Sequence, residues 1–197
     1  MKTIRMNRKF PALVALLALA ISPAAWSYDS AVNFGLGQYS LDYQDQARSV
    51  KGNTAGWRLG YVGRFNEYIG FDVRMGGAGE TSTAGLELKP GLFLSPLFRP
   101  SFPVGEKVDL YGLIGFTSLA IGRTTATTTE DIIARVGGSI GMGAEFYFDK
   151  HMAAGIELIS YQHNVDYGPK SDYSNWTGVT QARVSLSSIT ASFKYQL

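Results

Sequence analysis

Three observations predict that this chain is all-β and folds as an eight-stranded antiparallel up-and-down transmembrane β-barrel. Segments of about ten residues alternate apolar and polar side chains, which is typical of strands with two different faces. Glycine, at 23 of 197 residues, and aromatic residues, at 13 %, are frequent, whereas cysteine is absent. Short and long connections alternate between the segments, as they do in a wall of strands that run up and down.

Residues 1–27 have the features of a secretory signal peptide. A basic start is followed by the apolar stretch Phe10–Ile21, and Ala25 and Ser27 supply the small residues of a cleavage site. The alternative, an anchoring helix, requires about 20 apolar residues, and the stretch is shorter than that. We therefore divide the chain into a signal peptide and a mature β-barrel domain at 28–197.

Charge and cysteine content exclude several classes of function. The leader carries four basic residues and no acid, and without it 14 bases face 16 acids, a net charge of −2. That balance gives no indication of a nucleic-acid partner. The absence of cysteine rules out disulfides, thiolate nucleophiles and Cys-based zinc sites. Since His151 and His163 are the two histidines of the sequence, we expect neither a metal site nor a cofactor.

Eight strands are expected, in the segments 31–43, 56–64, 68–76, 86–94, 108–121, 136–148, 152–161 and 189–197. In the first, the parity of the apolar residues changes between Leu36 and Tyr39, which predicts a β-bulge near Gly37. The segment 108–121 is apolar on both faces, so the pattern does not orient it. Long polar connections are expected at 44–55, 77–84, 122–134 and 162–182.

The nature of the two strand faces decides between a membrane barrel and a soluble β-sandwich or lipocalin-like fold. The face that carries charges is rich in glycine, whereas the opposite face carries large apolar side chains, with aromatic ones near the strand ends. This is the inverted arrangement of a membrane barrel, apolar toward lipid and polar inside. A closed barrel also satisfies its backbone hydrogen bonds in lipid, and eight strands leave an interior that side chains fill.

The mature chain resembles the small eight-stranded outer-membrane proteins of Gram-negative bacteria, the OmpA/OmpX-type or opacity-porin family. The likeness rests on the alternating end of the chain, 192–197, on the central stretch 109–116, and on the layout of the connections. It implies an outer-membrane location, with short turns in the periplasm and long loops outside. It also implies that Phe193, Tyr195 and Leu197 form the signal read by the barrel-assembly machinery, although the family usually ends in Phe.

The inward-facing charges form the first candidate site. Opposite charges inside a narrow barrel have to pair, because an unpaired buried charge costs several kcal/mol. The structural interpretation is therefore a filled polar lumen, and the functional alternative is a gated path for ions. The residues expected in this lumen network are Arg58, Asp72, Arg74, Glu87, Lys89, Glu145, Glu157 and Lys194.

The longest expected loop supplies the second candidate site. Aromatic side chains there suit either a recognition surface or the aromatic girdle of a barrel, and the sequence does not decide between them. The residues are Tyr161, His163, Tyr167, Tyr173 and Trp176. His163 loosely resembles the catalytic histidine of lipid A deacylases, but Val165 stands where that pattern has a serine. A solvated histidine is the alternative.

Basic residues of the loops are candidates for contact with lipopolysaccharide phosphates, or are simply solvated. They are Arg48, Lys51, Arg123, Arg135, Lys170 and Arg183. We therefore expect a monomeric, non-enzymatic barrel that contacts outer-membrane lipid, lipopolysaccharide, and host or envelope ligands through its loops. The alternatives are a narrow porin-like channel for ions or small solutes, and a lipid A-modifying enzyme that uses His163.

Overall fold

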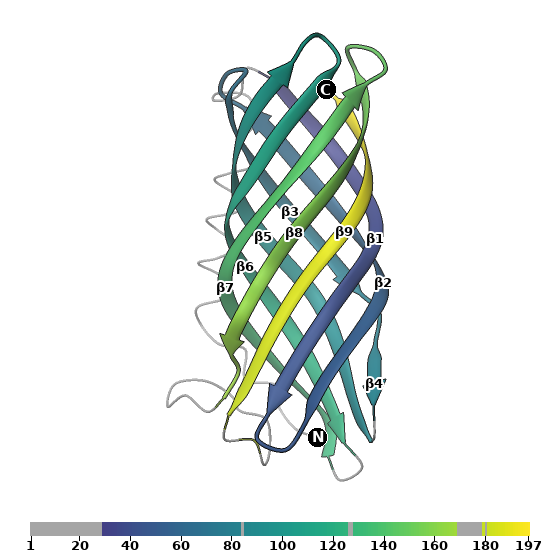
Figure 1. Ribbon diagram of the computed structural model, residues 1–197, viewed down its shortest axis with the longest axis vertical. Helices are drawn as coiled ribbons and strands as arrows, with labels where there is room; N and C mark the ends of the chain where they lie inside the picture. Colours follow the sequence, from purple (N-terminus) through teal and green to yellow (C-terminus); the bar gives the residue numbers. More distant parts are fainter. Residues whose placement is uncertain (1–28, 84, 126–127, 169–178, 180) are drawn as a thin grey trace, which may run out of the picture.

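The computed structural model describes residues 29–83, 85–125, 128–168, 179 and 181–197, and it forms a closed antiparallel β-barrel (Figure 1). Its strands are β1 (Asp29–Asp45), β2 (Ser49–Arg64), β3 (Ile69–Ala78), β4 (Thr81–Thr83), β5 (Leu86–Val104), β6 (Val108–Thr125), β7 (Thr128–Tyr147), β8 (Met152–Asp166) and β9 (Ala182–Gln196). The short β4 pairs with β5 beyond the end of β3. It therefore continues the same position in the wall, which has eight positions.

The barrel closes because β1 pairs with β9 and β3 pairs with β5. The start of β1 and the end of β9 lie at one end, together with the short turns at 65–68, 105–107 and 148–151 (Figure 1, top). We call this the turn end and the opposite one the loop end. The predicted eight-stranded transmembrane topology is confirmed. The predicted signal peptide, 1–27, lies outside the described residues and stays a prediction.

The outer wall changes character along the strands. On β1, the outward residues Val32, Phe34 and Leu36 near the turn end are large, apolar and exposed. Equivalent residues on the other strands complete an apolar belt around the barrel. Further along β1 the outward residues become polar, beginning with Gln38 and Ser40. The strand therefore passes from a lipid-facing into a water-facing part of the wall.

The interior changes in the opposite sense. Near the turn end, the inward side chain Asn33 of β1 is polar, whereas Tyr39, Leu41 and Tyr43 near the loop end are apolar and fully buried. They belong to a core that includes inward residues of the other strands. The loop-end half is thus built like a water-soluble barrel, apolar inside and polar outside, and the turn-end half is inverted.

The predicted bulge near Gly37 is wrong. The register of β1 with both neighbours runs through this position without a shift, and β1 keeps one face inward throughout. The parity changes because the apolar side chains turn from lipid to the core where the strand leaves the belt. Gly37 is required for another reason, since a Cβ there would lie 2.1 Å from the carbonyl oxygen of Ile189 in β9.

The strands extend into segments that were expected to be long connections. Segment 44–55 falls largely within β1 and β2, and much of 122–134 belongs to β6 and β7. The polar outward residues of the loop-end wall make these strand ends look like loops. The structure also orients β6, whose inward face carries Leu113 and whose outward face carries Ile114. Among the described residues, no helix is long and apolar enough to cross a membrane.

Candidate functional site

A network of buried charges crosses the lumen in the turn-end half. Arg74 of β3 forms an ion pair with Asp72 and donates a hydrogen bond to Glu157 of β8 at 2.6 Å. Arg58 of β2 donates to Asn33 at 2.7 Å and lies 3.4 Å from Glu157. Since β3 and β8 occupy opposite sides of the barrel, the Arg74–Glu157 contact spans the lumen.

A second cluster lies closer to the turn end. Arg99 contacts Glu145 at 2.9 Å, and Lys194 pairs with the same carboxylate. The Arg99 guanidinium also lies over the ring of Tyr111, 3.7 Å from its centroid, a cation–π arrangement. Arg99 is 3.9 Å from Asp72, which joins the cluster to the Arg74 network. Together the two clusters occupy the lumen with paired charges.

The structure brings most of the expected lumen residues together, but not all of them. The buried members are Arg58, Asp72, Arg74, Glu145, Glu157 and Lys194. The prediction that Glu87 and Lys89 point into the lumen is wrong. At this level β5 turns Leu86 and Leu88 inward, so Glu87 faces out and Lys89 pairs with Glu80 on the outer wall at 2.7 Å.

Sequence reasoning missed Arg99 and Asp109, which the structure buries in the network. A register shift between Pro90 and Phe93 breaks the alternation of β5 upstream of Arg99. The sequence holds a pattern that could have identified Asp109. Asp109 and Tyr111 lie on the same face of the strand, and the apolar Leu110 between them lies on the opposite face.

An aromatic layer closes the lumen on the loop-end side of the charges. The ring of Tyr161 lies 4.4 Å from that of Phe93 and stacks at 6.1 Å against Tyr39. Tyr167 is also fully buried, and its hydroxyl donates to Gln162 at 3.0 Å. The prediction of Tyr161 and Tyr167 as surface recognition residues is therefore wrong. Tyr173 and Trp176 lie outside the described residues.

A bulge in β8 explains this burial. The register of β8 with β9 shifts between Ser160 and Gln162, so that Tyr161 and Gln162, which are consecutive, both point inward. Gln162 then donates to the carbonyl oxygens of Thr117 and Arg135, at 3.1 and 2.8 Å. Bulges commonly re-aim side chains in this way.

The same bulge leaves His163 exposed on the outer wall. Its Nε2 lies 3.1 Å from the Asn164 side-chain amide, and Ser185 Oγ accepts the Asn164 backbone N–H at 2.9 Å. Within the described part of the chain, His163 has no hydrogen bond to a hydroxyl or a carboxylate. A nucleophile–base pair around His163 is therefore not assembled from these residues. Nor do the described residues contain a group of three or more His, Asp or Glu that could hold a metal.

The remaining candidates lie on the surface or at its rim. Phe193, Tyr195 and Leu197 are exposed on the outer wall of β9 and at the end of the chain, and their role in assembly stays a prediction. Of the basic residues, Arg48, Lys51 and Arg183 are exposed, Arg123 and Arg135 are turned into the barrel, and Lys170 lies outside the described residues.

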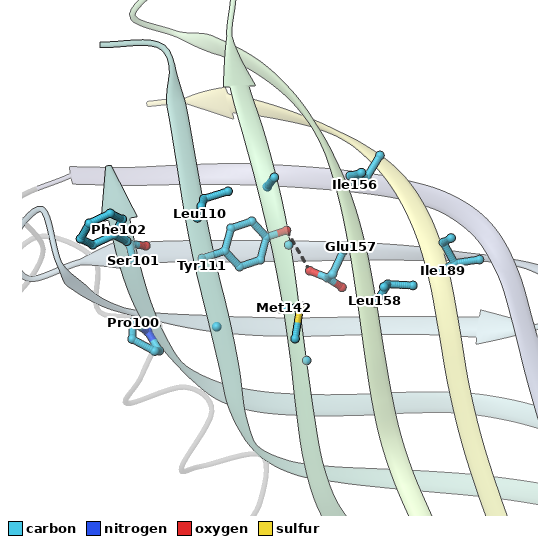
Figure 2. A pocket seen from close by; sticks show the side chains of 14 residues that line it. Pro100, Ser101, Phe102, Leu110, Tyr111, Met142, Ile156, Glu157, Leu158 and Ile189 are labelled. Carbon is cyan, nitrogen blue, oxygen red and sulfur yellow. Dashed lines mark hydrogen bonds between the residues drawn. The ribbon is translucent and has the colours of Figure 1, made fainter. Parts of the chain in front are cut away.

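The lipid-facing wall is grooved rather than smooth. A groove of about 700 Å³ crosses β5 to β9 in the belt, and a second of about 610 Å³ adjoins it. Figure 2 shows Leu110, Met142 and Leu158 along the first, with the Tyr111 hydroxyl bonded to Glu157 at 3.1 Å. The groove thus runs over the wall outside the charge network.

Comparisons with known proteins agree with this architecture. The neisserial surface protein NspA, OprG from Pseudomonas aeruginosa and Ail from Yersinia pestis are similar in structure, with TM-scores of 0.57, 0.58 and 0.51. They are 13 %, 13 % and 14 % identical over 85 %, 87 % and 85 % of this chain, and 99 %, 97 % and 99 % of theirs. At these identities the likeness concerns the fold. The comparison with curated proteins gives no match.

A match to a family profile goes further than these likenesses. The profile described as "Outer membrane protein beta-barrel domain" covers residues 12–196, which is nearly the whole chain. The closed barrel, its apolar belt and its polar lumen are those expected of such a protein. The chain therefore belongs to the outer membrane protein β-barrel domain family.

Proposed function

We propose that the protein is a closed, non-enzymatic outer-membrane barrel that presents its loop-end wall and loops to partners outside the cell. The partners are lipopolysaccharide and host or envelope ligands, and the role is adhesion or envelope integrity. The observation that carries this proposal is the double closure of the lumen. An ion-paired layer fills the turn-end half, and the core of aromatic and aliphatic side chains fills the loop-end half.

Both layers oppose solute passage, which supports the closed barrel over the channel. An open path would require the Arg74–Glu157 contact to break across the lumen and the Tyr39–Tyr161 stack to separate. Breaking one buried pair costs about 3–5 kcal/mol. The channel alternative predicts single-channel steps in a planar bilayer that change in Arg74→Ala or Glu145→Ala. We expect a flat baseline, and wild-type steps that respond to these substitutions would refute the closed barrel.

The loop-end half supports a role in display. Its strands continue beyond the apolar belt with a packed core inside, so the loops are held on a structured base rather than at the membrane surface. Recognition residues placed on loops of a rigid scaffold are a common arrangement. The similar barrel Ail has been solved with a heparin analogue, sucrose octasulfate, which agrees with ligand binding by barrels of this fold.

The display function is tested by replacing residues 169–178 with a short Gly/Ser linker. We expect binding of cells that carry the protein to glycan-coated or host-cell surfaces to fall to background. The barrel itself should still migrate differently on SDS gels with and without boiling. A matched Gly/Ser replacement of 105–107 at the turn end controls for loop shortening in general. Unchanged binding after the 169–178 replacement would refute adhesion through this segment.

The absence of enzymatic activity has its own test. A lipid A-modifying enzyme changes the mass of lipid A on overexpression, and His163→Ala abolishes that change. We expect the mass of lipid A to stay the same with wild type and variant. A mass change that disappears in His163→Ala would overturn the non-enzymatic assignment.

Assembly and oligomeric state complete the proposal. The outward side chains of Phe193, Tyr195 and Leu197 lie at the end of the last strand, where an assembly machinery can reach them. We expect Leu197→Asp to lower the amount of barrel in the outer membrane, and Leu197→Phe to leave it unchanged. We also propose a monomer, and chemical crosslinking in membranes that yields a defined dimer would contradict it.

A further inference from the structure

Two neighbouring cross-strand rows of outward side chains border the 610 Å³ groove on the wall. Each step in a row is a register pair of adjacent strands. The lower row is Gly112–Met142–Leu158–Ile189–Gln38, and the upper row is Ile114–Ile140–Ser160–Ser187–Ser40–Asn53. The groove therefore crosses six strands, β6 through β9 and then β1 and β2.

The upper row changes from apolar to polar along its length. Ile140 lies within the apolar belt, because Met142 and Val136, outward residues on either side of it along β7, are also apolar and exposed. Ser40 lies beyond the belt, since the apolar run of β1 ends at Leu36. The strands are tilted relative to the barrel axis (Figure 1). A cross-strand row therefore shifts from the belt toward the loop end as it passes from β7 to β2. The groove is thus amphipathic, with its polar part at the edge of the lipid.

The polar part has unused hydrogen-bonding capacity. Among the described residues, the side chains of Gln38, Ser40, Asn53 and Ser187 have no hydrogen-bond partner. From Ser160 to Asn53 the row spans three strand spacings, roughly 14 Å at about 4.8 Å each. That length corresponds to a disaccharide rather than to a single phosphate group.

Two cations lie further toward the loop end, about 7 and 13 Å along their strands from this row. Lys51 is two residues from Asn53 on the outward face of β2, and Arg183 is four residues from Ser187 on β9. Both are exposed, and neither has an ion pair within the described part of the chain. Asp42 is the register partner of Lys51, and Asp166 is that of Arg183, but neither pair forms an ion pair. The cations are therefore available to an anionic ligand.

We propose that this groove binds a phosphorylated acyl-sugar lipid of the outer leaflet, that is, lipid A of lipopolysaccharide. An acyl chain lies between Ile114, Ile140 and Met142, where the groove continues the lipid-facing belt. The sugar hydroxyls and amides bind the row of Ser187, Ser40 and Asn53, and the phosphates contact Lys51 and Arg183. The inference rests on the proposed contact with lipopolysaccharide and assigns it a site on the wall.

The test compares lipid retained by wild type and by Ser187→Trp, which fills the groove. The protein is assembled in phosphatidylethanolamine nanodiscs with lipid A, released, and examined by native mass spectrometry. We expect roughly tenfold less retained lipid A in Ser187→Trp. Ser118→Trp is the matched control, because Ser118 faces outward on β6 away from the groove, between Leu94 and Val136. It should retain lipid A as wild type does.

Three further measurements keep the inference falsifiable. Lys51→Gln with Arg183→Gln should lower retention of lipid A and leave retention of a dephosphorylated lipid A unchanged. Equal retention by the two Trp variants, or equal retention of phosphatidylglycerol and lipid A by wild type, would overturn the inference. Only variants that keep the heat-dependent shift on SDS gels are compared. The protein with residues 169–178 replaced should still retain lipid A, so that loss of adhesion and loss of this site are told apart.

Discussion

Substitution of Arg74 by Met tests whether the lumen network stabilises the fold. The Arg74 guanidinium contacts Asp72 through two nitrogens and Glu157 through a third, and all three side chains are fully buried. Methionine keeps much of the volume of the side chain and removes the charge. The substitution therefore leaves two buried carboxylates without their shared partner.

The expected loss follows from what remains around each carboxylate. Glu157 keeps Arg58 at 3.4 Å and the Tyr111 hydroxyl at 3.1 Å. Of its ion pairs within the described residues, Asp72 keeps the longer contact with Arg99, at 3.9 Å. Breaking a buried pair costs about 3–5 kcal/mol, and the remaining partners of Glu157 place this case near 3 kcal/mol.

The measurement is urea-induced unfolding in lipid vesicles, followed by the gel shift and by tryptophan fluorescence, to which Trp57 on the outer wall contributes. Lys89→Met is the matched control, because it removes a cation whose pair with Glu80 is half exposed. We expect Arg74→Met to lower the free energy of unfolding by about 3 kcal/mol and Lys89→Met to leave the unfolding midpoint nearly unchanged.

Equal midpoints for Arg74→Met and wild type would refute the reasoning, as would a comparable loss in Lys89→Met. If Arg74→Met does not fold, Asp72→Asn is added in the same chain. Removing the uncompensated carboxylate should then recover folding in part. If the double variant is less stable than Arg74→Met, unpaired charge is not the cause of the loss.

Three further predictions address glycine, the bulge and the loop-end wall. Gly37→Ala should destabilise the barrel by about 1–3 kcal/mol in the same assay, because the added Cβ meets the β9 backbone, whereas Gly138→Ala, with open space, should not. Gln162→Leu should cost about 1–3 kcal/mol, since three buried hydrogen bonds at the β8 bulge are lost. The hydrogen bond from Lys89 and its charge hold the pKa of Glu80 below its usual value, so Lys89→Met should raise that pKa in an NMR titration. The contribution of this pair to stability is present above the ordinary Glu pKa and is lost as the pH falls through the lowered one, and an unchanged titration of Glu80 would contradict it.

The sequence predicts the fold and most of the turn-end network. In that half of the barrel, the apolar face of each alternating strand is always the outer, lipid-facing one. Arg58, Arg74 and Lys194 stand opposite large apolar residues on their strands, and in a membrane barrel the smaller or charged face must be the inner one. A period of two does not say which face is inner. The prediction assumes that every strand faces lipid over its whole length.

The assumption fails where the wall leaves the lipid, and the wrong predictions cluster there. The prediction places Lys89 inside because its strand neighbours Leu86 and Leu88 are apolar. In the water-facing part of the wall, however, the apolar residues are the inner ones. Tyr161 failed for a different reason. The bulge that buries it next to Gln162 depends on pairing with β9, and no local residue pattern reveals such pairing.

The apolar belt differs in height around the barrel, and this difference bears on the proposed lipid site. On β1 the outward apolar run covers Val32 to Leu36, whereas on β7 it extends from Ile132 to Phe146. At about 3.3 Å per residue along a strand, the belt is much taller on the β7 side than on the β1 side. A bilayer meets such a wall by thinning beside β1 or by tilting of the barrel. Either adjustment brings lipid headgroups to the level of Ser40 and Ser187. At that level the wall carries hydroxyl groups in place of apolar side chains.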